Sequence, residues 1–224
     1  MFIDLAPVRN GEMKYIDLAA TLTVDDLRAA TNASIDFLLS QIIDLTDADV
    51  TFDPVDPEAN DPHAAPGEEH IGWSLAHLIA HFTASSEEWA AYASILARGI
   101  VYTPEPRLRY ETPWRDITTQ AQAVQRLEES RRIRLGYLST FPDTPFLDVK
   151  RELSERFIER HGELNAVAGF LFGLSHEYGH YEQVKEVRRQ VIAARSAATQ
   201  TATATVATVK TVGTVETASA ATGD

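Results

Sequence analysis

The sequence contains no cysteine. This absence excludes disulfide frameworks, thiolate nucleophiles, iron–sulfur clusters and cysteine-based zinc sites, so any metal must be held by His, Asp, Glu, carbonyl groups or water. No run approaches the ~18 consecutive apolar residues that a membrane-spanning helix needs. The N-terminal segment carries acidic residues where a secretory signal has lysines ahead of an apolar run. We therefore expect a cytoplasmic protein without a membrane partner.

Basic residues are scarce relative to acidic ones. The 20 lysines and arginines face 33 aspartates and glutamates, which gives a net charge of −13. An acidic surface repels phosphate backbones, so we expect no nucleic-acid partner. The chain has 224 residues, and 44% of them are hydrophobic. That is enough for one globular domain with a real core.

Large apolar side chains are missing from the last part of the chain. Residues 196–224 are almost entirely Ala, Thr, Val and Ser. Ordering a residue costs about 1–2 kcal/mol of backbone entropy, and these short side chains return little burial. The sequence therefore predicts a folded domain over residues 1–195, followed by a disordered low-complexity tail over residues 196–224.

Helical periodicity of the apolar residues is present in four segments, and no strand pattern stands out. These segments span approximately residues 24–45, 75–98, 115–140 and 163–195. Thr23 and Asp26 have the spacing of a capping box, Ser74 fits an N-cap, and Gly99 fits a helix stop. Long linkers rich in Pro and Asp separate the segments, and residues 141–162 are expected to hold a short helix. The pattern predicts an all-α protein, a four-helix bundle with long linkers.

Four of the seven histidines form two pairs with i, i+4 spacing, His77/His81 and His176/His180. Such residues lie ~5–6 Å apart on one helix face, so both imidazoles of a pair can bind one ion at ~2.0–2.1 Å. A third ligand must come from a neighbouring helix. His81 is favoured over His77, because His77 falls in the first turn. Three His ligands leave one coordination position open, which is typical of catalytic sites. The remaining histidines lie in linkers and are expected at the surface: His63, His70 and His161.

The run from His176 to His180 also reads H-E-x-x-H, the zinc metalloprotease signature with Glu177 as general base. No histidine follows His180, however, and Gln183 stands where the longer signature needs glycine. Proteolysis is therefore the weaker hypothesis. Glu177 points away from the face that carries the two histidines, so it is expected to be a solvated carboxylate or to support a ligand.

Two motifs resemble those of a known family. The run W-S-L-A-H-L-I-A-H over residues 73–81 resembles the second-helix motif of the DinB/YfiT-like superfamily, in which W-S precedes a metal-binding histidine. The pattern His176-x-x-x-His180-x-x-Gln183 is similar to the last-helix motif of that superfamily. The resemblance covers residues 1–195. It implies an antiparallel four-helix bundle in which His81, His176 and His180 bind a divalent metal, commonly Zn or Ni.

The resemblance also implies activities and partners. Relatives include S-transferases that depend on a low-molecular-weight thiol, bacillithiol or mycothiol, and a mycothiol-dependent isomerase. A small-molecule substrate and a homodimer are therefore expected.

Further side chains are candidates for a role around the metal. Gln183 lies one turn after His180 and is expected to orient a ligand or substrate. Glu88 lies seven residues after His81, where it would support a ligand imidazole or be an ordinary solvated charge. His77 is expected to support a ligand or to face the substrate.

Two functional hypotheses follow. The first is a metal-dependent transferase or hydrolase whose ion activates a thiol or water. The alternative is a non-enzymatic, stress-associated bundle protein whose histidines bind metal or stabilise the structure.

Overall fold

The computed structural model describes residues 1–62, 64–102 and 105–219, with side chains up to residue 200. Within these residues the chain is helical and contains no strand, which confirms the all-α class. The elements are α1 (Ala6–Arg9), α2 (Tyr15–Ala19), α3 (Val24–Ile42), α4 (Asp47–Val50), α5 (Leu75–Ala97), the 3-10 helix η1 (Trp114–Asp116), α6 (Gln120–Leu138), α7 (Glu155–His161), α8 (Ala166–Gly179) and α9 (Tyr181–Ser219). None of the described helices is long and apolar enough to cross a membrane.

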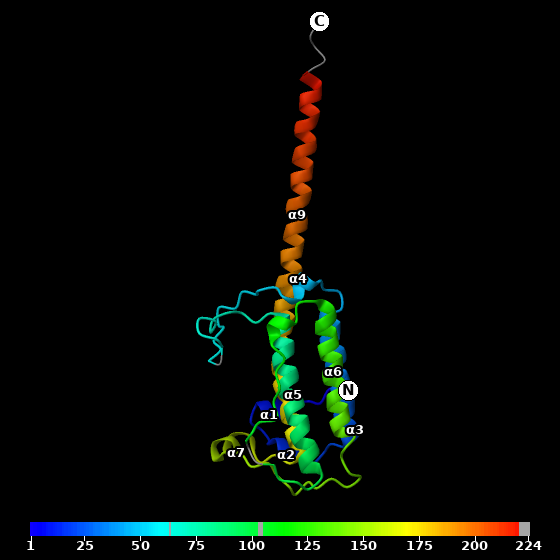
Figure 1. The fold of residues 1–224 in the computed structure, drawn as a ribbon, viewed down its shortest axis with the longest axis vertical. Helices are drawn as coiled ribbons and strands as arrows, with labels where there is room; N and C mark the ends of the chain where they lie inside the picture. Colours follow the sequence, from blue (N-terminus) through cyan, green and yellow to red (C-terminus); the bar gives the residue numbers. More distant parts are fainter. Residues whose placement is uncertain (63, 103–104, 220–224) are drawn as a thin grey trace.

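Four rods form the bundle: α3, α5, α6, and α8 continued by α9 (Figure 1). Helix α5 packs most extensively against α8 and α6, and α3 packs against α6. Helix α5 is itself rich in Ala and Ser, and it is buried on nearly all sides. This arrangement confirms the four-helix bundle and makes α5 its central helix.

Local capping signals set where the helices begin. Asp26 N–H donates to Thr23 Oγ1, and Thr23 N–H donates to the Asp26 carboxylate, so the predicted capping box forms. Ser74 Oγ accepts from His77 N–H and starts α5. Gly99, with φ of 81°, follows the end of α5. The short helix expected in the linker before the last rod is α7.

The fourth rod was predicted as one continuous helix over residues 163–195, and the structure divides it into two helices. It is broken at His180, which is the C-cap of α8, and α9 begins at the next residue. The preceding Gly179 costs about 1 kcal/mol relative to alanine inside a helix, which lowers the cost of a break at this position. The third helix is also shorter than predicted, because a Thr119–Gln122 capping box starts it after η1.

Helix α9 continues to Ser219 and extends past the bundle as a single rod (Figure 1). Val191 is the last buried residue among the described side chains. The structure gives residues 196–219 a helical backbone, and the disorder expected for residues 196–224 stays a prediction. Residues 220–224 lie outside the described residues. The domain boundary at residue 195 stays a prediction.

Candidate metal centre

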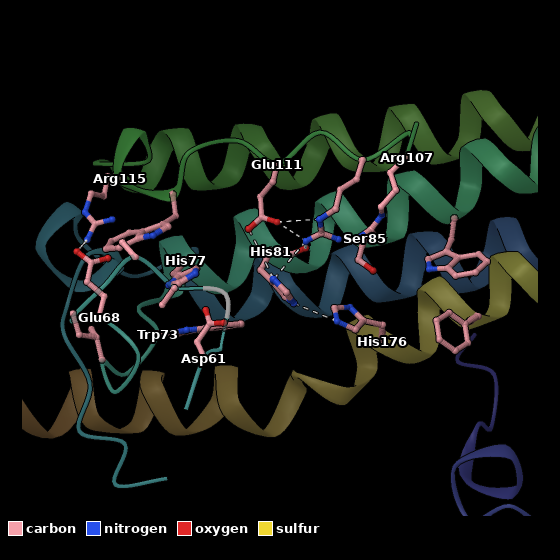
Figure 2. Close-up of a pocket in the computed structure, with 17 residues that line it drawn as sticks. Asp61, Glu68, Trp73, His77, His81, Ser85, Arg107, Glu111, Arg115 and His176 are labelled. Carbon is pink, nitrogen blue, oxygen red and sulfur yellow. Dashed lines mark hydrogen bonds and ion pairs between the residues drawn. The ribbon is translucent and has the colours of Figure 1, made fainter. Parts of the chain in front are cut away.

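Three imidazoles meet between α5 and the α8–α9 rod: His81, His176 and His180. One ring nitrogen of each lies within 4.8 Å of the others. His81 Nε2 and His176 Nε2 are 3.3 Å apart and point toward each other (Figure 2). Two nitrogens bound to one tetrahedral ion at ~2.0–2.1 Å would lie ~3.3 Å apart. The rings therefore fit a divalent cation.

Burial keeps these imidazoles neutral. Desolvation lowers the pKa of His81 to about 2 and that of His176 to about 4, helped by the neighbouring imidazoles and Arg109. Desolvation also lowers the pKa of His180. Neutral imidazole is the form that binds divalent metals. The site is thus prepared for a cation at neutral pH without prior loss of protons.

The second ring nitrogen, Nδ1, differs among the three histidines. That of His180 lies 3.0 Å from Gln183 Oε1, which directs the opposite nitrogen toward the cluster. That of His81 lies 3.5 Å from Arg109 Nη2 and 3.9 Å from Glu111 Oε1. That of His176 is buried and has no hydrogen-bond partner among the described residues. The position of His176 therefore depends on the backbone that carries it.

A cavity of about 670 Å³ opens beside the cluster. One wall is formed by α5 and α8, which contribute His81, Ser85, Trp89, Phe172 and His176. Two linkers form the other walls, with Asp61, Glu68, Ile71 and Trp73 from residues 51–74 and Arg107, Arg109, Glu111, Trp114 and Arg115 from residues 98–119. The two linkers are joined by an ion pair of 2.6 Å between Arg115 and Glu68 (Figure 2). All three tryptophans of the chain thus line one cavity.

His77 belongs to the cavity wall and lies outside the three-histidine cluster. Its ring stacks between two indoles, with centroids 4.3 Å from Trp73 and 4.9 Å from Trp114. The Arg115 guanidinium stacks on Trp114 at 4.0 Å. His77 is therefore part of the cavity lining, with its ring held between two tryptophans.

The linker residues of the cavity were missed by the sequence analysis. Arg109 Nη2 donates to the backbone oxygen of His81 at 3.1 Å, and Arg109 pairs with Glu111. Arg107, two residues earlier, also lines the cavity. Charged residues thus alternate with Leu108 and Tyr110 along the chain. A period of two is typical of an extended segment that packs one face against its neighbour. The sequence alone could therefore have indicated that this linker packs against the bundle.

Glu88 does not take either position expected for it. It is only 2% exposed. Its carboxylate accepts from Arg107 Nε at 2.9 Å and from the Tyr92 hydroxyl at 3.2 Å, not from an imidazole. The expectation of a solvated charge or a support for His81 was wrong, because α5 has no water-facing side at this position and a buried carboxylate needs a cation.

Glu177 is fully buried, so the expectation of a solvated carboxylate was also wrong. It accepts from Ser34 Oγ, from Ser86 Oγ at 3.2 Å and from Arg134 Nη1 at 3.1 Å. Burial raises the pKa of Glu177, and Arg134 opposes this shift. Glu177 is not among the residues that line the cavity. It does not occupy the general-base position of a metalloprotease.

The other histidines lie away from the cluster. His70 is exposed, and its Nδ1 lies 2.9 Å from the backbone oxygen of Ala59. His161 is half-buried against the rings of Tyr15, Phe157 and Phe172, so it is only partly exposed at the surface where it was expected. His63 lies outside the described residues.

Comparison with known proteins agrees with the two motifs. The family model of the DinB superfamily matches residues 44–184. This range contains both histidine pairs, Gln183 and both linkers that line the cavity. No curated protein and no solved structure matches the chain. The resemblance drawn from the motifs is confirmed.

Proposed function

Because this chain belongs to the DinB superfamily, we propose that it is a metal-dependent enzyme that acts on a small molecule in the cavity beside His81, His176 and His180. The observation that carries the proposal is the set of three half-buried imidazoles whose ring nitrogens lie within 4.8 Å of one another. Nitrogen donors of this kind suit Zn and Ni. A divalent ion held there acts as a Lewis acid and lowers the pKa of a thiol or water that it contacts.

The residues around the cluster are suited to bind and orient a thiol substrate. Gln183 orients His180 through Nδ1. Arg109, which is paired with Glu111, lies next to His81, where its guanidinium would donate hydrogen bonds to an anion such as a thiolate. Trp73, Trp89 and Phe172 provide apolar walls that exclude water from the bound molecule. These features favour a thiol-dependent S-transferase or a related hydrolase. The cytoplasmic location and the homodimer stay predictions.

The metal content of the purified protein tests the first part of the proposal. We expect about one equivalent of Zn or Ni without added metal. The His176→Ala variant should lose it. The matched control is His77→Ala, which removes an imidazole from the same cavity but not from the cluster, and it should keep the metal. A wild-type protein without tightly bound metal would favour the non-enzymatic bundle protein.

Tryptophan fluorescence tests the second part. Since every tryptophan lines the cavity, a bound thiol should change the emission directly. A titration of the metal-loaded protein with bacillithiol, mycothiol and glutathione should reveal saturable binding, followed by transfer to an electrophilic acceptor. A metal-loaded protein that neither binds nor transfers any of these thiols would contradict the thiol-dependent activity and leave the metal site intact.

A further inference from the structure

The Glu177 carboxylate joins the helix that carries two metal ligands to all three other rods of the bundle. Glu177 directly follows His176 and precedes His180 by three residues. Its hydrogen-bond donors are Ser34 of α3, Ser86 of α5 and Arg134 of α6. Both Glu177 and Arg134 are fully buried. One side chain thus fixes α8 in three directions at the level of the metal centre.

Ser34 extends this network across the helix break. The Tyr181 hydroxyl donates to Ser34 Oγ at 2.8 Å, and Ser34 Oγ in turn donates to Glu177. Tyr181 directly follows His180 and is the first residue of α9. The residues that follow His176 and His180 are therefore hydrogen-bonded to the same hydroxyl group of α3, one on each side of the break.

Stability alone does not account for such a network. Removing a carboxylate and a guanidinium from water is costly, and well-packed apolar residues of similar volume often replace a buried ion pair without loss of stability. What an ion pair with fixed hydrogen bonds adds is a defined register between helices. His176 depends on this register, because its Nδ1 has no hydrogen-bond partner among the described residues to hold the ring.

We propose that Glu177, Arg134 and Ser34 are positioning residues that set the register of α8 and thereby the spacing of His176 and His180 in the metal centre. This inference rests on the proposed metal site. It gives the glutamate of the H-E-x-x-H pattern a role that is unrelated to proton transfer: it orients the backbone between the two histidines without lining the cavity.

The test compares metal binding and stability in full-length variants. Glu177→Leu combined with Arg134→Met removes both charges and keeps the volume, and Ser34→Ala and Glu177→Gln are milder versions that keep the fold if the double variant does not. The matched control is Leu96→Ala, a truncation in a separate core cluster at the other end of α5. The readouts are the urea midpoint, the Kd for Zn²⁺ by chelator competition, and the visible absorption spectrum of the Co²⁺-loaded protein.

We expect the network variants to bind Zn²⁺ at least tenfold more weakly and to show a shifted Co²⁺ spectrum under conditions where they are fully folded. Leu96→Ala should lower the urea midpoint and leave both metal readouts as in the wild type. Network variants with wild-type affinity and spectrum would overturn the positioning role while leaving the metal site in place. A wild-type protein that binds neither ion would overturn the proposed function, and this inference with it.

Discussion

Replacing Gly173 by alanine should force α5 and α8 apart next to the metal centre. An added Cβ would lie 2.8 Å from Trp89 Cβ and 3.4 Å from Ser86 Cα. Trp89 Cβ and Ser86 Cα are fixed by the backbone of α5, so they cannot move aside as the end of a flexible side chain can. The same change at Gly169, one turn earlier, would meet the Trp89 ring at 3.6 Å, an ordinary van der Waals contact.

Both substitutions gain the higher helix propensity of alanine, but only Gly173→Ala introduces a steric clash. Alanine in place of glycine stabilises a helix by about 1 kcal/mol. Overpacking a buried contact costs about 1–3 kcal/mol. Gly169→Ala should raise the free energy of unfolding by up to about 1 kcal/mol. Gly173→Ala should range from neutral to about 2 kcal/mol less stable.

Urea unfolding followed by circular dichroism measures both effects. Gly136→Ala on α6 calibrates the helix contribution, because nothing lies within 4 Å of its added Cβ. Gly173→Ala should also weaken Zn²⁺ binding, since α5 carries His81 and α8 carries His176. Equal stability of the Gly169 and Gly173 variants, with unchanged metal affinity, would show that the α5–α8 contact yields without cost and would refute the reasoning.

Three further predictions concern protonation, ion pairs and the domain boundary. Burial lowers the pKa of all three imidazoles of the cluster, so protons should compete with Zn²⁺ only below the ordinary histidine pKa of about 6.5. Chelator competition between pH 7.5 and 4.5 should show that the protein retains the metal at pH 6. Release of half of the metal at pH 6.5 would contradict this expectation. Arg107→Ala removes the ion-pair partner of the buried Glu88 and should cost about 1–3 kcal/mol in urea unfolding. Arg115→Ala, whose partner Glu68 is much more exposed, should cost less than about 1 kcal/mol. Equal losses would argue that the burial of the glutamate does not set the cost. A chain truncated after residue 195 should keep the urea midpoint of the full chain, and a clear drop would place part of the tail in the fold.

The starts of α3 and α5 were predictable because a capping residue lies directly before each of these helices. Thr23 and Ser74 therefore marked α3 and α5 correctly. The break at His180 was not predictable in this way. The apolar periodicity continues from α8 through Val184, Val187 and Val191 of α9, and one glycine changes helix stability by only about 1 kcal/mol.

Local spacing predicted the His176/His180 pair, whereas His81 was identified from its position in the second helix and from the W-S motif, and the cavity was not predicted. An i, i+4 pair is close on any helix, so His176 and His180 were bound to be neighbours whatever the tertiary structure. Arg107, Arg109 and Glu111 belong to a linker, and their place over α5 depends on how residues 98–119 cross the bundle. The alternation of these charges indicates an extended segment but not which helix it covers.

Glu88 and Glu177 were both misplaced because a charge on a helix is normally assigned to its solvated side. A helix that is apolar or small on all sides has no such side and is buried, as α5 and α8 are. A glutamate in such a helix must find a cation from another element, and the arginine-rich segments of this chain are where the partners lie: Arg107 in a linker and Arg134 on α6. The position of an acidic residue in a helix that lacks a polar face is thus itself a signal. It indicates a buried ion pair that ties the helix to a more polar neighbour, and here one such pair lies directly beside the three-histidine cluster.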